Sequence, residues 1–429
     1  MNPEQMRSEW NQRAKEDAHF YVAFGRQQQT EEEFLATADE VVPGFEKEFV
    51  RLPASKTADR SALEIGCGPG RLMLPMSKHF GEIHGVDVSE EMLELARKRL
   101  ASVRGAQVHI TAGSDLSMLG DDYFDFVYSY TVFQHIPSKD IVLSYLAEAQ
   151  RVLKPGGVLC CQIRGIAPIP SELIRGSETW TGCWFAPEEM AEFSRRHRFP
   201  LVAISGLHTQ YMFTTFRKPV STAGEEVRMR ATVKAVTSAI GAGVRIPQRG
   251  REAAVSLWLD GMAEDASLTD YPVRFDGQEQ LGCYLSPVTQ EGGCQMNCRL
   301  PDATQPGPVR VELFFHQNAL PEPHEVIVEP ASAYAPRVLD VTDGINLTSH
   351  YRVEMGGAKI LMEDIRDPAA IGFQMAGQSV VGLQFESKDP ITATYEFAFH
   401  LPHDAPRGPQ SLRILNAGQE WASVDVDVV

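Results

Sequence analysis

A short apolar strand that runs directly into a glycine-rich turn, at residues 63–70, constrains the fold of this chain more than any other stretch. Its sequence is Leu-Glu-Ile-Gly-Cys-Gly-Pro-Gly, and a helix-compatible run follows at 71–74. Gly66, Gly68 and Gly70 let the backbone turn sharply and approach a bound ligand with no Cβ in the way. Such a turn also occurs as a plain strand-to-helix connection, so its neighbours along the chain must decide its role.

Two acids follow the turn at positions that a parallel sheet would bring to the same edge. Asp87 ends the next apolar run, 17 residues beyond Gly70, where a carboxylate accepts both hydroxyl protons of a ribose. The alternative for Asp87 is an acid at a helix N-terminus beside Ser89. Asp115 follows the third apolar run, where it would accept from an adenine amino group while a neighbouring backbone N–H reads the ring. The order of these features predicts a nucleotide-like site.

Residues 60–220 alternate short apolar runs with longer amphipathic ones, which is typical of strands joined by crossover helices in a parallel sheet. Before them, residues 5–52 show helical spacing with a break at Pro43-Gly44, which predicts two or three helices. A helix is expected over Glu90–Leu100, with Ser89 as its N-cap. The expected strands are Ala62–Ile65, Ile83–Val86, Val108–Thr111, Phe124–Ser129, Val158–Ile163, Leu201–Leu207 and Tyr211–Arg217.

Four stretches in this order, 63–70, 85–89, 124–129 and 153–157, resemble the motifs of class I S-adenosylmethionine-dependent methyltransferases. The resemblance covers about residues 60–220. It implies a Rossmann-like α/β domain whose seven-stranded sheet has its last strand antiparallel, inserted between its neighbours. A dehydrogenase is the rival interpretation, but its turn has the pattern G-x-G-x-x-G, whereas this turn is G-x-G-x-G with an acid two residues before it.

The resemblance also implies the cofactor-binding residues. Glu64 would lie beside the methionine amino group, the turn beside the methionine portion, Asp87 at the ribose and Asp115 at the adenine, with S-adenosylhomocysteine as the product. Met92 would border the adenine, and it fits a helix core position equally well. The predicted cofactor-binding residues are Glu64, Gly66, Cys67, Gly68, Gly70, Asp87, Val88, Met92, Ser114, Asp115, Leu116, Ser129 and Tyr130.

The acceptor is expected at the loops after the fourth, fifth and later strands, because ligands of open α/β sheets bind outside the carboxyl ends of the strands. Methyl transfer is an in-line displacement in which alignment can suffice, so a base is needed only for a poorly ionised acceptor. His135 is the candidate base, and a role without proton transfer is the alternative. Arg164 would anchor an acceptor carboxylate or phosphate, or form a surface ion pair. The candidate substrate contacts are aromatic residues, a type more often found in cores: Tyr21, Phe133, Trp180, Trp184 and Tyr211.

After Lys218-Pro219 the pattern changes to short alternating runs punctuated by Pro and Gly, which is typical of all-β structure. Leu300-Pro301 and Gly307-Pro308 recur as Leu401-Pro402 and Gly408-Pro409, with a constant offset of 101. Residues 275–278 are echoed at 375–378, with an offset of 100. This period predicts two tandem immunoglobulin-like β-sandwiches. The alternative is one larger β-domain with two similar hairpins. The expected domains are an N-terminal helical cap at 1–56, a methyltransferase domain at 57–220, and β-sandwiches at 225–332 and 333–429.

Composition narrows the class of partner. The net charge of -17 argues against nucleic acid and anionic membranes, whose binding needs clustered Lys and Arg. The first residues lack the apolar core of a secretory signal and no stretch resembles a membrane-spanning helix, so we expect a cytoplasmic location. Cys294 and Cys298 are close enough in sequence to suggest a metal site, but no other Cys or His lies at a recognised ligand spacing from them. No metal is therefore predicted.

These observations lead to one functional prediction and one rival. We expect an enzyme that methylates O or N of a small-molecule or sugar-like acceptor. The rival is a binding or scaffold protein with a vestigial or sensory cofactor site and partner-recognising β-domains. Homo-oligomer formation through the β-domains is left open by the sequence.

Overall fold

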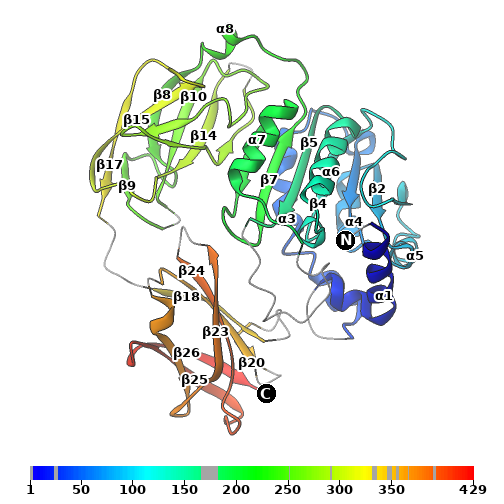
Figure 1. Ribbon diagram of the computed structural model, residues 1–429, viewed down its shortest axis with the longest axis vertical. Helices are drawn as coiled ribbons and strands as arrows, with labels where there is room; N and C mark the ends of the chain where they lie inside the picture. The colour runs from blue at the N-terminus through cyan, green and yellow to red at the C-terminus, as the bar shows by residue number, and fades with distance from the viewer. Residues whose placement is uncertain are drawn as a thin grey trace. The chain divides into compact units, whose positions relative to one another are not determined.

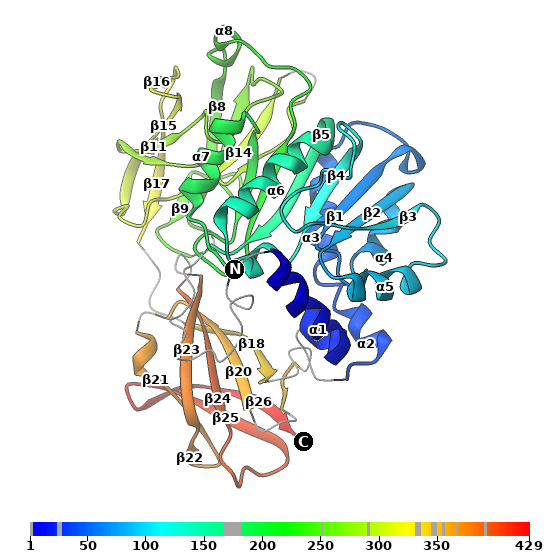
Figure 2. The ribbon, with the colours of Figure 1, turned by 45° about the vertical axis from the view of Figure 1, so that its right-hand side comes forward.

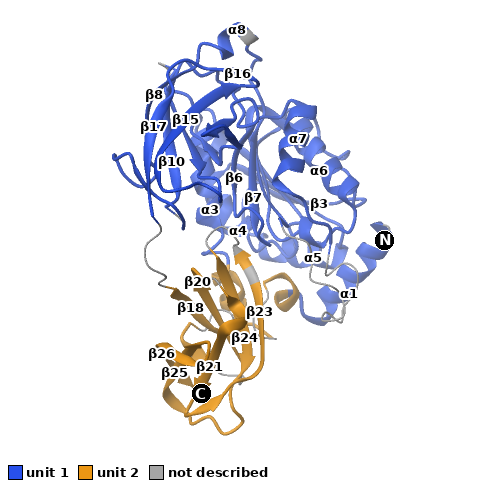
Figure 3. Cartoon of the chain, turned by 60° about the vertical axis from the view of Figure 1, so that its left-hand side comes forward, with its two compact units in different colours: residues 1–18, 38–330 blue, residues 19–37, 331–429 orange. Residues whose placement is uncertain are grey.

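The computed structural model describes residues 3–23, 28–165, 182–250, 252–289, 292–330, 336–344, 350–353, 357–365, 367–389 and 393–429. The chain forms two compact units, which Figure 3 colours separately. The first unit contains residues 1–18 and 38–330, and the second contains residues 19–37 and 331–429. The segment with the predicted cofactor motifs therefore lies within the first unit.

The first unit is built on a sheet whose strands alternate with helices (Figure 1). Its first seven strands follow the order β3-β2-β1-β4-β5-β7-β6, and β7 runs antiparallel between β5 and β6. This confirms the expected methyltransferase-type arrangement. Strand β5 starts five residues earlier than expected, because Leu153 already pairs with Phe124. The strands are β1 (Ser61–Ile65), β2 (Glu82–Asp87), β3 (Ala106–Ile110), β4 (Phe124–Ser129), β5 (Leu153–Ile163), β6 (Leu201–Ser205) and β7 (Met212–Arg217).

Two apolar layers cover this sheet, because successive side chains of a buried strand point to opposite faces. One layer joins Leu63, Val127 and Leu159 to the apolar residues of α6 (Lys139–Val152) and α7 (Pro187–His197). The other joins neighbouring strand residues such as Ala62 and Phe126 to the helices α3, α4 and α5. These helices are α3 (Val42–Glu46), α4 (Met73–Met76) and α5 (Glu90–Arg99), and Ser89 is the N-cap of α5 as expected.

The N-terminal segment is helical, but the predicted break at Pro43-Gly44 is wrong. Pro43 lies in the first turn of α3, where its missing N–H has no helical partner to lose. The helices α1 (Pro3–Val22) and α2 (Glu31–Ala36) precede α3. The short 3-10 turns η1 (Lys47–Arg51) and η2 (Thr57–Asp59) lead from α3 to β1. Two more, η3 (Ser77–His79) and η4 (Phe133–His135), follow α4 and β4.

The first β-sandwich continues the methyltransferase sheet. Strand β13 pairs with β6 through Tyr284 and Ala203, so the order runs on as β6-β13-β14-β10-β8 and the sheet has eleven strands. The facing sheet has the order β12-β11-β15-β17-β9. This part contains α8 (Glu225–Arg228), β8 (Thr232–Ser238), β9 (Arg245–Pro247), β10 (Ala254–Asp260), β11 (Val273–Phe275), β12 (Gln278–Gln280), β13 (Tyr284–Leu285), β14 (Cys294–Arg299), β15 (Gly307–Phe315), β16 (Asn318–Ala319) and β17 (His324–Glu329).

The second β-sandwich, whose strands are orange to red in Figure 2, belongs to the second unit and has its own core cluster. Its sheets have the orders β18-β20-β24-β23 and β19-β26-β25-β21-β22. Its elements are β18 (Arg337–Asp343), β19 (Arg352–Val353), β20 (Gly357–Glu363), η6 (Pro368–Ala370), β21 (Ile371–Met375), β22 (Gln378–Ser379), β23 (Val381–Asp389), β24 (Thr394–His400), β25 (Gly408–Asn416) and β26 (Gln419–Val428).

The sequence repeat is a structural repeat. Strands β15 and β25 both begin at the glycine of a Gly-Pro pair, and each follows a turn closed by a bond to the proline carbonyl of the preceding Leu-Pro pair, at 3.0 and 2.9 Å. The tips of the β11–β12 and β21–β22 hairpins have matching left-handed backbones, with φ of 47° and 85° in the first and 51° and 81° in the second. In each sandwich a short strand, β9 or β19, pairs in parallel with the last long strand. The expected fold of a methyltransferase domain followed by two β-sandwiches is confirmed, while the exact domain limits stay a prediction.

Candidate active site

The glycine-rich turn is held against the end of β2. The backbone N–H groups of Gly66 and Cys67 both donate to the carbonyl of Val86, at 2.8 and 3.0 Å. Gly66 has a φ of +72°, and a Cβ on it would lie 2.3 Å from a methyl group of Val132, in the loop after β4. A side chain is therefore excluded at Gly66 both by backbone conformation and by space.

Glu64 is a buried acid on β1, directly before the turn. It is 3% exposed, and the Tyr128 hydroxyl donates to its Oε2 at 3.0 Å. Burial raises the pKa of Glu64 to about 8, an effect that the Tyr128 bond and the Arg71 charge only partly offset. A cation placed beside Glu64 would favour its ionised form. The position suits an ammonium group, as the resemblance to methyltransferases implies.

Asp87, at the end of β2, ties the turn to the start of α5. Its Oδ2 accepts from the Gly68 N–H at 2.9 Å, and its Oδ1 accepts from the Ser89 N–H at 2.8 Å. Burial raises the pKa of Asp87, and the backbone bonds lower it. Each carboxylate oxygen keeps a lone pair beyond its backbone bond, so the group retains the capacity to accept from two ribose hydroxyls. Half-buried Val88 follows, and Met92 is buried one turn into α5.

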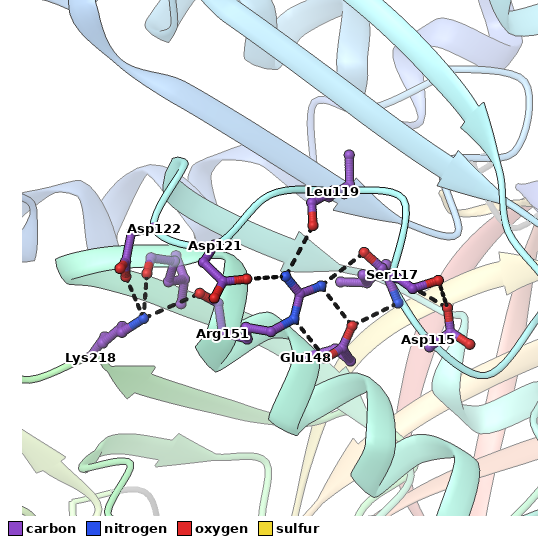
Figure 4. A network of polar contacts seen from close by, with 10 residues as sticks. Asp115, Ser117, Leu119, Asp121, Asp122, Glu148, Arg151 and Lys218 are labelled. Carbon is purple, nitrogen blue, oxygen red and sulfur yellow. Dashed lines mark hydrogen bonds and ion pairs between the residues drawn. The ribbon is translucent and has the colours of Figure 1, made fainter.

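The loop after β3 carries Asp115 and is fixed by a network that the sequence did not reveal (Figure 4). Arg151 on α6 donates to Glu148 through Nε and Nη2, both at 2.8 Å, and to the carbonyls of Leu116 and Leu119. Glu148 in turn accepts from the Leu116 N–H at 3.1 Å. The Leu116 N–H, predicted to read the adenine, is thus already bonded. An adenine that takes this donor must displace Glu148.

Asp115 itself faces its own loop. Ser117 donates to its Oδ1 through both the hydroxyl, at 2.7 Å, and the backbone N–H, at 3.1 Å, and these bonds lower the pKa of Asp115. The Ser114 hydroxyl lies 3.4 Å from the other oxygen. The carboxylate is therefore ionised and oriented by its neighbours, as an acceptor for an exocyclic amine requires.

The first part of α1, up to Ala18, lies across the same edge of the sheet. The Asn11 amide oxygen accepts from the Ser89 hydroxyl at 2.7 Å, after β2. Arg7 donates to the carbonyl of Thr111 at 3.2 Å, after β3, and the Trp10 ring meets the His135 ring edge-on at 5.6 Å, after β4. These contacts join α1 to three of the four loops that carry predicted cofactor residues, those after β2, β3 and β4.

The loop after β4 is fixed by two buried glutamines. The Thr131 N–H donates to Gln162 Oε1 at 3.0 Å, so Gln162 Nε2 is the end that donates to Gln134 Oε1, at 3.2 Å. Gln134 Nε2 therefore faces His135 Nε2, at 3.2 Å, as a donor. This pattern occupies the Nε2 lone pair of His135. Thr131 itself has a φ of +55°, a conformation that the Gln162 bond helps to hold.

Three aromatic rings line the edge beyond this loop. Tyr130 stacks with Phe213 at 6.0 Å and with Tyr211 at 6.4 Å between ring centroids. Burial raises the pKa of Tyr130 to about 12. Ser129, just before it, donates through its hydroxyl to the carbonyl of Ile65 at 2.9 Å and so joins the ends of β4 and β1. Of the rings stacked on Tyr130, that of Tyr211 is exposed, at 43%.

The other predicted acceptor residues fall in different places. Phe133 is 1% exposed and packs against Tyr145 in the core, which favours a packing role over a substrate contact. Arg164 is buried at the end of β5, and Trp184 is half-exposed with the Lys139 ammonium over its ring at 5.1 Å. Tyr21 belongs to the second unit. Trp180 lies outside the described residues, so its role stays a prediction.

Sequence reasoning missed Tyr128, Gln162 and the Glu148–Arg151 pair. The pair has a detectable signal, because an acid and an arginine three residues apart on a helix lie on one face. Gln162 carries no such signal, since its partners come from segments that are 28 to 48 residues away.

Within the ranges that the structure describes, no cluster of three or more His, Cys, Asp or Glu side chains is arranged to hold a metal. The seven cysteines form no disulfide. No helix among the described residues is both long and apolar enough to span a bilayer.

Comparison with known proteins agrees with this geometry. Residues 62–157 match the family model described as a methyltransferase domain. The matched residues include the glycine turn, Asp87, Asp115 and the 153–157 motif, so the chain carries a class I S-adenosylmethionine-dependent methyltransferase domain. The cofactor of such a domain is S-adenosylmethionine, and the acids and glycines described above fit it.

Particular relatives are similar to part of this chain. The demethylmenaquinone methyltransferase of Shouchella clausii is 32% identical over 108 residues, which is 24% of this chain and 45% of that protein. The chain thus spans less than half the length of the curated relatives it matches. Phosphoethanolamine N-methyltransferase 1 of Haemonchus contortus, solved with phosphoethanolamine and S-adenosylhomocysteine, has a TM-score of 0.38 and 13% identity, covering 52% of this chain and 50% of that chain. Magnesium protoporphyrin IX methyltransferase of Synechocystis has a TM-score of 0.38 and 15% identity, covering 50% and 98%.

Proposed function

We propose that this protein transfers a methyl group from S-adenosylmethionine to O or N of a small-molecule or sugar-like acceptor. The observation that carries the proposal is the position of Asp87, whose two oxygens join the glycine turn to the start of α5 and keep lone pairs for a ribose. Glu64, one strand away, provides a buried carboxylate for an ammonium group. Intact acids at both positions favour catalysis over a scaffold role.

The bound cofactor supplies an electrophilic methyl group, and this chain supplies position and charge. Glu64 compensates the methionine ammonium once it is ionised, and Asp87 accepts the ribose hydroxyl protons. The loop after β4, held by Gln162, aligns the acceptor along the transfer axis. Alignment and removal of water are the main contributions that a protein makes to such a displacement.

A general base is not part of this proposal. His135 Nε2 already accepts from Gln134, and its neutral ring then carries its proton on Nδ1. The His135 ring can take a proton from the methyl acceptor only if its bond from Gln134 breaks. His135→Ala is therefore expected to keep the single-turnover rate between about pH 6 and 9 within a factor of a few. A loss of about a hundredfold at low pH, with recovery as pH rises, would instead identify His135 as the base.

The stacked rings of Tyr130, Tyr211 and Phe213 support an acceptor with a planar or apolar face. The decisive activity experiment incubates the full chain with methyl-labelled S-adenosylmethionine and fractionated metabolite extracts, and follows label in small molecules. Label transfer by the wild type but not by Asp87→Asn supports the proposal.

Calorimetry with S-adenosylhomocysteine separates the enzyme from the scaffold. Asp87→Asn keeps the side-chain shape and removes the charge that accepts the ribose protons, so affinity should fall by about 2 kcal/mol, or roughly thirtyfold. Asp125→Asn is the matched control. Asp125 accepts a bond from Lys154 and lies near the start of β4, whereas the predicted cofactor residues follow the end of that strand. Absence of binding by the wild type would overturn the proposed function.

A further inference from the structure

A cavity of about 100 Å³ lies in the first unit, between the methyltransferase sheet and the first β-sandwich. Its wall contains Arg51, Arg217 and Glu264 together with the apolar Val202, Ala266 and Leu285. Arg217 pairs with Val158, whereas Met212 pairs with Ile163 at the carboxyl end of β5. Five residues of strand span about 17 Å. The cavity is therefore remote from the predicted cofactor site.

Arg51 is held rigidly at this cavity. It is 4% exposed, and its Nε donates to Glu48 while its Nη1 donates to the carbonyl of Leu285, both at 2.6 Å. The guanidinium also lies 5.0 Å over the Tyr284 ring. Its Nη2 is buried and has no hydrogen-bond partner in the described part of the chain. One end of a fixed, buried cation thus offers unused donors.

Arg217 approaches the cavity from β7. Its Nη2 donates to the carboxylate of Glu264 at 2.9 Å and its Nη1 to the carbonyl of the same residue at 3.2 Å. Its Nε is buried and, like Arg51 Nη2, finds no acceptor among the described residues. The Glu264 side chain is 58% exposed, so water screens its charge and it is free to turn outward.

Two guanidinium groups from different elements therefore border one small cavity, and each also has one buried nitrogen without an acceptor among the described residues. Buried donors in native proteins are almost always bonded to protein, water or a ligand. Guanidinium groups match the oxygens of carboxylates and phosphates better than they match water. We propose that this cavity binds a small oxyanion, the carboxylate or phosphate group of a metabolite, at a site separate from methyl transfer.

The apolar part of the wall limits the ligand to a compact one. The cavity also borders the pairing of β6 with β13, since Leu285 belongs to β13 and Val202 to β6. A bound oxyanion would link Arg51, which precedes the sheet, to Arg217 within it. Binding therefore stabilises the first unit.

The test measures thermal unfolding of the full chain, without cofactor, in sodium phosphate or sodium acetate against sodium chloride of equal ionic strength. Phosphate, acetate or both should raise the unfolding midpoint of the wild type by a few degrees. Arg217→Met removes one donor group, and Ala266→Leu fills the cavity without touching a charge. Both should abolish the shift. Arg245→Met is the matched control, because Arg245 forms an exposed ion pair with Glu329 in the same sandwich.

The outcomes distinguish a built site from a salt effect. The proposal is supported if the unfolding midpoint shifts in the wild type and in Arg245→Met but not in the other two variants. A response to phosphate alone or to acetate alone identifies the preferred anion. An equal shift in all four proteins means an adventitious ion only and overturns it. No shift in the wild type means that water fills the cavity and also overturns it. A cooperative unfolding transition in sodium chloride alone shows that each variant is folded, so the outcome does not depend on the proposed function.

Discussion

The two β-sandwiches have the same strand order but different attachments. In the first, the edge strand β13 has two residues and pairs with β6 of the methyltransferase sheet. In the second, the equivalent strand β23 has nine residues and is the outermost strand of its sheet. The apolar core of the first is continuous with the methyltransferase core, whereas the second has a separate cluster. One edge strand thus decides whether the same fold becomes part of a catalytic unit.

The β23 edge also carries features that hinder pairing with another strand. Its register with β24 shifts twice, between Val381 and Gln384 and between Ser387 and Asp389. Gly382 has a left-handed φ of +67°. Bulges of this kind twist an edge away from a partner strand. Such protection matters because Val381 and Phe385, at 60% and 45% exposed, are apolar.

Truncation of the chain should show most clearly that the methyltransferase domain needs the first sandwich, but not the second, to stay folded. A chain that ends at Pro330 keeps the eleven-stranded sheet and should unfold cooperatively and bind S-adenosylhomocysteine. A chain that ends at Gly224 loses the partner of β6 and uncovers core residues such as Leu201 and Ile204, so it should aggregate. Soluble yield, circular dichroism and calorimetry measure this. A folded, cofactor-binding 1–224 fragment would show that the first sandwich is as dispensable as the second.

The ionisation of Glu64 should have the next largest effect, on the free energy of unfolding of the first unit. The folded pKa of Glu64, about 8, lies above the ordinary glutamate pKa of 4.5, so between these pH values the folded state holds a proton that the unfolded state releases. With respect to this group, the apo protein should be most stable below about pH 4.5 and should lose about 5 kcal/mol as pH rises from there through 8. Glu64→Gln should flatten this dependence in urea unfolding. An unchanged pH profile in the variant would assign the loss to other groups.

Substitutions at the β6–β13 junction should have an intermediate effect on stability, larger than the same substitution on the equivalent strand of the second sandwich. Leu285 on β13 is buried, so Leu285→Ala should destabilise the first unit by about 3 kcal/mol. Leu383, on the equivalent strand β23, is half-buried, and Leu383→Ala should cost the second unit about 1 kcal/mol. Urea unfolding of each variant provides the measurement. Equal costs would mean that the junction is no better packed than the free edge.

The matching hairpin tips predict the smallest effect. Ala376 and Asp276 occupy the same left-handed position, with φ of 51° and 47°. Alanine tolerates this backbone poorly, whereas Asn and Asp tolerate it well. Ala376→Asn should therefore stabilise the second sandwich by about 0.5–1 kcal/mol, and Asp276→Asn should leave the first unchanged. Thermal unfolding compares them, and a stabilisation of both tips to the same degree would contradict the argument.

Local sequence determined a large part of this protein. The strands, the Ser89 cap and the left-handed glycines follow from hydrophobic period and from residue chemistry within a few positions. The order of Glu64, the glycine turn, Asp87 and Asp115 indicated the cofactor class for the same reason. The repeat at 101 residues indicated two sandwiches because each copy closes its own turns locally.

Tertiary structure alone decided how these parts join. The pairing of β13 with β6 connects residues 203 and 284, and Arg51 bonds to the carbonyl of Leu285. Bonds that end on a backbone group leave no trace in the side-chain pattern, so neither contact was predictable. The same holds for Gln162, whose partners are two backbone groups and one amide. Sequence specified which elements form, and long-range hydrogen bonding and burial decided that one sandwich became part of the methyltransferase unit.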